Sequence, residues 1–462
     1  MANVATGFRA GWVLVINVVS AIPLRAGMTW LQHYRLRQFL RTSFWFWPFV
    51  VILITIFAAL PAVDWLEAKG ARFVFLWPDL PADRARTIVS SFSASMLTFL
   101  VFVLSSLIMV VQLASAQLTP RIMAITFADI QGKILTCVLL FSFLFGTGIL
   151  GRIEDGHVPL VGIKLLVISV LICVIIFLRF IPHLSMSLRP ISLMRRIAAE
   201  GQSTVESLYP SPYDTAVSEK ARRIPKNLLR DEARVLNYDG PSGVLLAFGA
   251  DDLVNAARTA GCTVELVTQV GNFVSRGDPL FLTFPPERPI DARILHGMVA
   301  IGAERTLEQD PVFAFRIIVD IAIRALSPAV NDPTTAVLAI DQLECLLREL
   351  GGRQLDPGMI YDGADELRLI IPVPDWEDFV SLAVSEIRLY GVSSIQVPRR
   401  LSAMLEHLME VLPASRSPAL KKELLLLGKG VTREFADVAE RKMVSTGDRQ
   451  GVGGTASGTD AA

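Results

Sequence analysis

The chain has few of the residues from which catalytic, metal and disulfide sites are usually built. Four cysteines and five histidines are spread over 462 residues, without the spacings typical of a zinc site or of a secreted disulfide framework. The sequence also contains no Gly-Lys-Ser/Thr phosphate loop, no nucleophile elbow and no dinucleotide-binding glycine pattern. We therefore expect no metal, no cofactor and no enzymatic activity. A membrane-embedded acyl or lipid enzyme is the third of three functional alternatives.

A surplus of charge of either sign is also missing. Lysine and arginine together number 44, as do aspartate and glutamate, so the formal net charge is zero. Such a chain has no global basic field that would attract a polyanion. We expect no nucleic-acid partner.

Hydrophobic residues, in contrast, make up 52% of the chain and are concentrated in its first 181 positions. Four apolar stretches approach the roughly 20 residues that cross a hydrocarbon core as a helix; they are 44–63, 89–114, 134–150 and 161–181. The first begins with "SFWFWPF", whose aromatic residues are typical of a membrane interface. An earlier apolar stretch, 11–24, is too short to span; it is either an interfacial helix or a signal-peptide core, and without a clean cleavage site we expect it to be retained.

The distribution of basic residues between the loops predicts the orientation of the spans. More of them lie before span one, between spans two and three, and after span four, namely Arg25, Arg35, Arg37, Arg41, Arg121, Lys133, Arg179, Arg189, Arg195 and Arg196. The opposite loops hold Lys69, Arg72, Arg84, Arg86, Arg152 and Lys164. We expect a multi-pass protein of the inner (plasma) membrane with both termini in the cytoplasm.

The second span carries a polar stripe, defined here as Ser91, Ser95, Thr98, Ser105, Gln112 and Ser115. Ser91, Thr98, Ser105 and Gln112 recur every seven residues, a repeat that keeps one face of a helix toward one neighbour. Small hydroxylated residues of this kind favour close packing between membrane helices. Alternatively, the stripe lines a water-filled or ion-conducting path in a homo-oligomer. No span has a charged residue near its middle, which argues against proton-coupled transport.

Beyond the spans, the pattern changes twice. Residues 182–230 form a basic, proline-containing connector, 231–290 a small strand-rich module, 291–445 a helical α+β domain and 446–462 a low-complexity tail. With an N-terminal cytoplasmic or interfacial segment at 1–43 and a transmembrane domain at 44–181, the predicted fold is a four-helix integral membrane protein followed by a cytoplasmic α+β domain. Within the last part we expect a helix over 291–309, further helices beginning at Asp310-Pro311, Asp332-Pro333 and Asp375, and a strand at 367–373.

The strand-rich module contains a turn similar to that of biotinyl- and lipoyl-carrying domains. The matching residues are Gly271, Val274, Gly277, Pro279 and Leu280. The resemblance implies a small barrel-like fold. The lysine that would carry a swinging cofactor is absent from "FLTFPPERP", so we infer no covalent cofactor.

A corner, residues 324–337 ("RALSPAVNDPTTAV"), interrupts the helical pattern with two prolines and several polar groups. Ser327-Pro328 and Asp332-Pro333 each read as a helix cap followed by a first-turn proline. The polar surplus is a candidate site for a small anionic ligand or ion; the candidate residues are Arg316, Asp320, Arg324, Ser327, Asn331, Asp332, Thr334 and Thr335. Arg316, Asp320 and Arg324 share one helix face, and an ordinary surface ladder of ion pairs would also explain them.

Several of these stretches together resemble a bacterial family of predicted membrane proteins, the domain-of-unknown-function family 2254. They are "SFWFWP", "VQLASAQLTPRIM", "GNFVSRGDPL", "FRIIVDIAIRALSPAVNDPTTA" and "IRLYG", within 43–410. The resemblance implies four membrane helices followed by a cytoplasmic domain, and no particular activity. Our leading hypothesis is an oligomeric channel- or transporter-like protein in the lipid bilayer with a cytoplasmic regulatory domain. The second is a membrane-anchored ligand-binding or scaffold protein.

Overall fold

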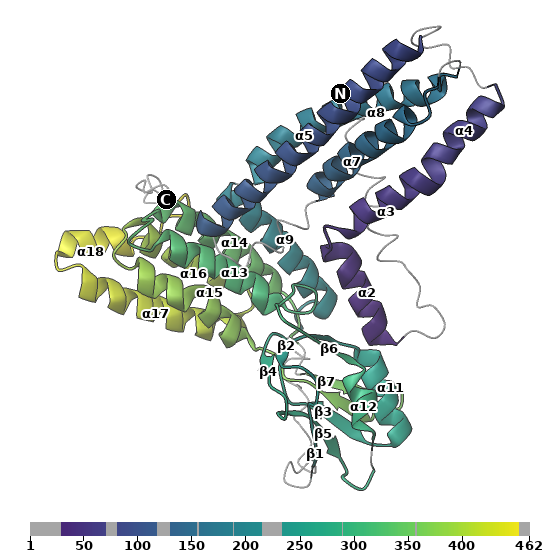
Figure 1. Ribbon diagram of the computed structural model, residues 1–462. Coiled ribbons are helices and arrows are strands. Elements are labelled where there is room, and N and C mark those ends of the chain that lie inside the picture. Colours follow the sequence, from purple (N-terminus) through teal and green to yellow (C-terminus); the bar gives the residue numbers. More distant parts are fainter. Residues whose placement is uncertain are drawn as a thin grey trace. The chain divides into compact units, whose positions relative to one another are not determined.

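The computed structural model describes residues 29–70, 81–117, 130–154, 157–187, 189–214, 233–288, 290–355 and 358–451 (Figure 1). The chain divides into two compact units. We call residues 37–189 the span unit, and the described residues outside that range the α+β unit. The predicted short segment 11–24 and the end of the tail lie outside the described residues.

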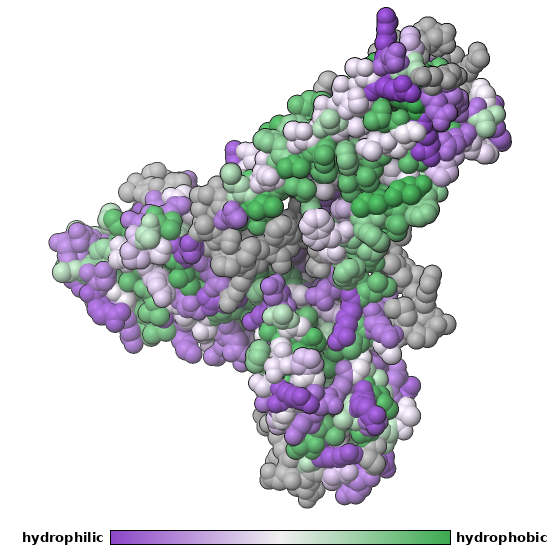
Figure 2. All heavy atoms as spheres, viewed as in Figure 1, coloured by the Kyte–Doolittle hydropathy of each residue, from purple (hydrophilic) through white to green (hydrophobic). Residues whose placement is uncertain are grey.

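The span unit contains four helices long and apolar enough to cross a membrane, which confirms the expected number. They cover Phe46–Ala68, Ala82–Gln112, Ile130–Leu150 and Leu160–Met186. Most extend beyond the predicted limits, because the helical backbone continues past the apolar residues that marked each stretch. Figure 2 shows hydrophobic residues along the sides of these helices, as expected of surfaces that face lipid. The elements are α3 (Phe46–Ile54), η1 (Thr55–Ala59), α4 (Leu60–Ala68), α5 (Ala82–Gln117), α7 (Ile130–Leu150) and α8 (Leu160–Ser187).

The first span is a single path of helix with a π-turn, η1, in its middle. Pro61 lies just after this turn and has no N–H to donate, so the regular hydrogen-bond ladder is interrupted there. The Thr55 hydroxyl donates to the carbonyl of Val51 at 2.8 Å and is fully buried. The π-turn Thr55–Ala59 therefore exposes no polar side chain.

At one end of the span unit, polar side chains join the ends of three helices. Arg152 pairs with Asp64 of α4 at 2.8 Å, and Arg86 of α5 donates to the carbonyl of Ile153. Glu67 accepts a hydrogen bond from the backbone N–H of Val161 at 3.1 Å. These contacts close one end of the helix bundle with polar groups.

The α+β unit begins with residues 29–36 of α2 (Trp30–Thr42). Its remaining helices are α9 (Pro190–Leu208), α11 (Ala250–Ala260), α12 (Ala292–His296), α13 (Pro311–Ala325), α14 (Pro333–Gly351), α15 (Trp376–Gly391), α16 (Gln396–Val411), η4 (Ala414–Arg416), α17 (Ser417–Glu434) and α18 (Val438–Ser445). Its strands are β1 (Arg234–Asn237), β2 (Gly243–Phe248), β3 (Thr263–Leu266), β4 (Phe273–Val274), β5 (Pro279–Phe284), β6 (Val299–Gly302), β7 (Met359–Tyr361) and β8 (Leu367–Ile370).

Two small sheets replace the expected barrel-like module. One has the order β1-β5-β3-β8-β7 and the other β4-β2-β6. Within the described residues neither closes on itself, because β1 and β7 remain edges of the first sheet and β4 and β6 edges of the second. The likeness of the turn to carrier domains thus extends to a local hairpin only. The predicted strand at 367–373 is present as β8, where it pairs in parallel with β3.

The prediction of one helix over 291–309 is wrong for most of that range. α12 begins at Asp291, whose side chain accepts a hydrogen bond from the Arg293 N–H, and ends before Gly297. The chain then forms β6, which pairs antiparallel with β2. Val299 and Ile301 are β-branched and favour a strand, whereas the prediction followed their apolar spacing alone.

The helices from α13 to α17 pack around a hydrophobic core. α13 lies against α9, α14 and α15, and α14 also contacts α16. Phe315 of α13 and Phe379 of α15 are fully buried, with their ring centroids 5.2 Å apart. Asp310, Asp332 and Asp375 cap α13, α14 and α15 through their side chains, as predicted.

The loop 303–310 forms hydrogen bonds to several elements of the α+β unit. Thr306 lies 3.5 Å from the Tyr34 hydroxyl of α2, and the carbonyl of Leu307 accepts a hydrogen bond from Thr204 of α9. The Gln309 side chain bonds to both the N–H and the carbonyl of Phe248, at the end of β2. The sheets and the helical layer are therefore connected through one short loop.

Candidate functional site

The polar groups of the corner are largely engaged in shaping the chain. Asp332 accepts hydrogen bonds from the Thr335 N–H at 3.1 Å and from the Thr335 hydroxyl at 2.5 Å. Asn331 adopts a positive φ of 45°, which asparagine tolerates better than most residues. Thr334, next to the capping aspartate, is exposed.

Ser327 does not cap a helix, contrary to the prediction. Its hydroxyl donates to the carbonyl of Arg324 at 2.7 Å, and its own carbonyl accepts from Val330 and Asn331. Ser327-Pro328 therefore forms a turn after α13, and a helix begins only at Asp332.

The Arg316 guanidinium is already neutralised by two carboxylates. It binds Asp320 one turn along α13 at 2.5 Å, and it also pairs with Glu386 of α15. The hydrogen bond from Arg316 lowers the pKa of the Glu386 carboxyl. The sequence pattern of α13 revealed Asp320 but not Glu386, which lies 70 positions further along the chain. Arg316 thus links two helices. Arg324, at the end of the same helix, is exposed.

Two of the most specific sequence stretches meet at this corner. A Cβ at Gly391, the last residue of "IRLYG", would lie 3.1 Å from a methyl group of Leu326 and 2.5 Å from one of Val397. Only glycine allows this close approach between the end of α15 and the corner. The corner is thus a packing junction, with Val330 and Tyr390 about half exposed beside it.

The polar stripe lies on the exposed side of α5. Ser91, Ser95, Thr98, Ser105 and Gln112 are all exposed, and the Thr98 hydroxyl bonds to the carbonyl of Ala94 within its own helix. The side chain of Ser115 lies outside the described part of the chain. The opposite face of α5 is buried against the rest of the bundle through Val89, Met96, Leu100 and Val103. The stripe therefore takes no part in packing within the span unit.

A second set of hydroxyls, not predicted from the sequence, lies inside the bundle. Ser142 of α7 is 3.0 Å from the hydroxyl of Ser169 and 3.3 Å from the sulfur of Cys173, both on α8. Ser93 of α5 is 5% exposed, and its hydroxyl has no hydrogen-bond partner. It lies where α5 passes Gly146 of α7. These serines do not recur at regular intervals, so no periodic signal identified them.

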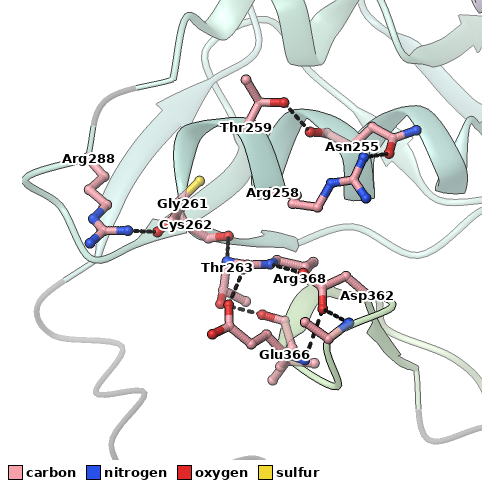
Figure 3. Close-up of polar contacts among 12 residues, drawn as sticks. Asn255, Arg258, Thr259, Gly261, Cys262, Thr263, Arg288, Asp362, Glu366 and Arg368 are labelled. Carbon is pink, nitrogen blue, oxygen red and sulfur yellow. Dashed lines mark hydrogen bonds and ion pairs between the residues drawn. The ribbon is translucent and has the colours of Figure 1, made fainter.

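Cys262, directly before β3, is buried near several hydrogen bonds that hold the five-stranded sheet together (Figure 3). Arg368 donates to Asp362 at 2.7 Å, and this bond lowers the pKa of the Asp362 carboxyl. The Thr263 hydroxyl donates to the carbonyl of Leu367, which joins β3 to β8. Burial raises the pKa of the Cys262 thiol, so the thiolate form that nucleophilic chemistry requires is disfavoured.

Two histidines of the α+β unit pair with carboxylates. His296 lies 3.1 Å from Asp239, and His407 lies 2.5 Å from Glu344. Among the residues the structure describes, no three His, Cys, Asp or Glu side chains are grouped so that they could hold a metal ion.

Comparison with known proteins identifies the family. Residues 41–407 match the family described as "Predicted membrane protein (DUF2254)". The chain belongs to this family. Its relatives include uncharacterised proteins of Mycobacterium bovis and Mycobacterium tuberculosis, each 28% identical over 452 residues, which cover 94% of this chain and 84% of theirs. No solved structure matches significantly. This DUF2254 protein is thus a predicted membrane protein with four apolar helices and an α+β unit.

Proposed function

We propose that this DUF2254 protein works as a homo-oligomer in the bacterial inner membrane, with both termini in the cytoplasm, and that its α5 helices line a polar path between the copies. The α+β unit then acts as the regulatory part. The supporting observation is that α5 presents its polar stripe on a face that its own bundle leaves exposed.

The exposed face has the heptad pattern of a helix that pairs with another helix. Between the stripe residues lie Ala94, Val101 and Ile108, which are also exposed, the latter two by 56% and 54%. Together with Ser91, Thr98, Ser105 and Gln112 they alternate at spacings of three and four residues. This spacing is that expected of the a/d seam of a left-handed helix pair. A seam of small hydroxylated and apolar residues suits close contact inside a membrane.

Exposure to lipid would suit this face less well than contact with a second copy. Hydrocarbon offers no hydrogen-bond partner to the Gln112 amide or to the serine hydroxyls, whereas an identical helix or a column of water does. The outer face of α8 is apolar over a shorter stretch, from Leu171 to Leu178, which ends at the exposed Arg179. The exposed faces of α5 and α8 therefore suit different neighbours.

Cross-linking tests the oligomeric contact. In a variant without Cys137, Cys173, Cys262 and Cys345, we expect Thr98→Cys and Val101→Cys to form disulfide-linked dimers under mild oxidation in membranes. The matched control is Ile175→Cys, which is similarly exposed but lies on α8. Gel mobility without reductant measures the yield. Equal yields at positions 101 and 175, or no dimer at either α5 position, would refute the seam.

Flux through reconstituted liposomes tests the polar path. Thr98→Leu combined with Ser105→Leu should reduce potassium or chloride flux by an order of magnitude or more. The two substitutions remove hydroxyls that would take the place of water molecules around a passing ion. Val174→Leu combined with Ile175→Leu on α8 is the control and should leave the flux unchanged. The absence of potassium, sodium and chloride flux in liposomes that contain the wild-type protein would exclude an ion pore.

A ligand-binding role at the corner has less support, since Arg316 and Asp332 are engaged within the α+β unit. We also propose that the protein is not an enzyme. This proposal rests on the missing motifs and on the structural setting of Cys262.

A further inference from the structure

Several partly buried arginines of the α+β unit are paired with acidic residues. Six of them have side chains that are 28% exposed or less, and each lies within 4 Å of a carboxylate. The pairs are Arg305–Asp310, Arg316–Asp320, Arg353–Glu349, Arg368–Asp362, Arg388–Glu423 and Arg400–Asp341. Buried cations are usually paired with an acid in this way. Removing a charged group from water costs free energy, and an unpaired charge inside the protein has no interaction that offsets this cost. For these six guanidiniums, the fold supplies an acid within ion-pair distance.

Arg416 differs from these six. Its guanidinium carbon lies 5.1 Å from the centre of the Tyr213 ring and 5.3 Å from that of Trp376. Its Nη2 donates to the carbonyl of Arg353 at 3.1 Å, but its Nε is buried without an acceptor. Across the described residues, no carboxylate forms an ion pair with it. Two aromatic faces hold the guanidinium in place while its charge stays uncompensated.

The local backbone adds to the positive charge. Arg416 is the residue before α17, and its side chain makes no capping hydrogen bond. The first turn of α17 contains no acidic residue, so the helix itself supplies no negative side chain to the positive end of its dipole. Burial lowers the pKa of Arg416, which reflects the same missing counter-charge.

Two hydroxyls lie beside this cation. The Tyr213 hydroxyl and the Ser415 hydroxyl are 2.5 Å apart, and Ser415 directly precedes Arg416 in the chain. Hydroxyls can donate to an anion, and a guanidinium N–H forms a strong, charge-assisted hydrogen bond to an oxygen of phosphate or carboxylate. We propose that Arg416, with the hydroxyls of Ser415 and Tyr213, binds a small phosphate-type oxyanion, either free in solution or as the head group of a lipid.

Binding of inorganic phosphate to the full chain tests the proposal. In nanodiscs of phosphatidylcholine at constant ionic strength, equilibrium dialysis should find one saturable phosphate per chain, and phosphate should raise Tm. Arg416→Gln should weaken the affinity at least tenfold. Arg433→Gln is the control, because Arg433 is an exposed cation on the same helix and its loss should leave the affinity unchanged.

A second variant keeps the test decisive if Arg416→Gln does not fold. Tyr213→Phe retains the ring against the guanidinium and removes only the hydroxyl, and it should lower the phosphate affinity severalfold. No saturable binding by the wild-type chain up to about 10 mM phosphate, weaker than a typical metabolite site, would overturn the proposal. So would equal affinities in the wild type and both variants.

The lipid composition distinguishes the two sources of the anion. If a lipid head group occupies the site, nanodiscs that contain phosphatidic acid should abolish the rise in Tm caused by phosphate. If the ligand is a soluble anion, the rise should be the same in both lipids. Neither result depends on whether the protein forms a pore, so this site and the α5 proposal can fail separately.

Discussion

Gly271→Ala is expected to lower the free energy of unfolding of the α+β unit by about 3 kcal/mol, since it combines backbone strain with disruption of a buried ion pair. Gly271 has a φ of +91°, and a Cβ there would lie 2.1 Å from Nη2 of Arg305 and 2.5 Å from Oδ2 of Asp310. Asp310 is 3% exposed and caps α13 through the Phe313 N–H. One added methyl group therefore displaces both the ion pair and the helix cap.

Gly277, at the other end of the same turn, provides a matched control. Its φ is +94°, almost the same as that of Gly271, but a Cβ there would meet nothing within 4 Å. Gly277→Ala should therefore carry only the backbone penalty, of about 1–2 kcal/mol. Denaturant titration in a mild detergent, followed by tryptophan fluorescence, measures both variants. Equal losses would mean that the Arg305–Asp310 pair adjusts without cost.

Gly146→Ala is expected to destabilise the span unit by about 1–3 kcal/mol, the usual cost of overpacking. A Cβ at this position would lie 2.3 Å from the hydroxyl of Ser93 and 3.2 Å from a methyl group of Leu166. The α5 and α7 helices would have to separate locally to accommodate it. Thermal unfolding of the detergent-solubilised protein measures the loss.

Ser93→Ala should reverse most of this effect. The substitution removes the oxygen that the new methyl group would meet, and that oxygen has no hydrogen-bond partner in its buried position. Ser93→Ala alone should be neutral or slightly stabilising, because it removes an unsatisfied polar group. The double variant should then unfold near the wild-type temperature. Additive losses would contradict the close contact of Ser93 with Gly146, because residues in contact are expected to be coupled.

Features that depend on neighbours in the sequence were predicted well. The Asp-Pro pairs at 310 and 332 capped the helices that follow them, because a cap and its helix lie within four residues. The four spans were evident from continuous apolar composition. The heptad spacing on α5 was also visible, since a repeat of seven describes one face of one helix.

Features that depend on distant residues were not predictable in the same way. Glu386 neutralises Arg316 from another helix, and no pattern on α13 indicates its presence. β8 completes a sheet that begins more than 100 residues earlier, so the strand-rich module seemed shorter and more closed than it is. Arg416 lies outside every motif, and its importance is apparent only once its ring contacts and missing carboxylate are known.

The loop 303–310 has a consequence for how the α+β unit unfolds. Within eight consecutive positions it bonds to α2, α9 and the end of β2, and it caps α13. Detachment of any of these partners breaks at least one hydrogen bond to the loop. We therefore expect loss of the sheets and loss of the helical layer to be coupled, so that the α+β unit unfolds as one cooperative unit.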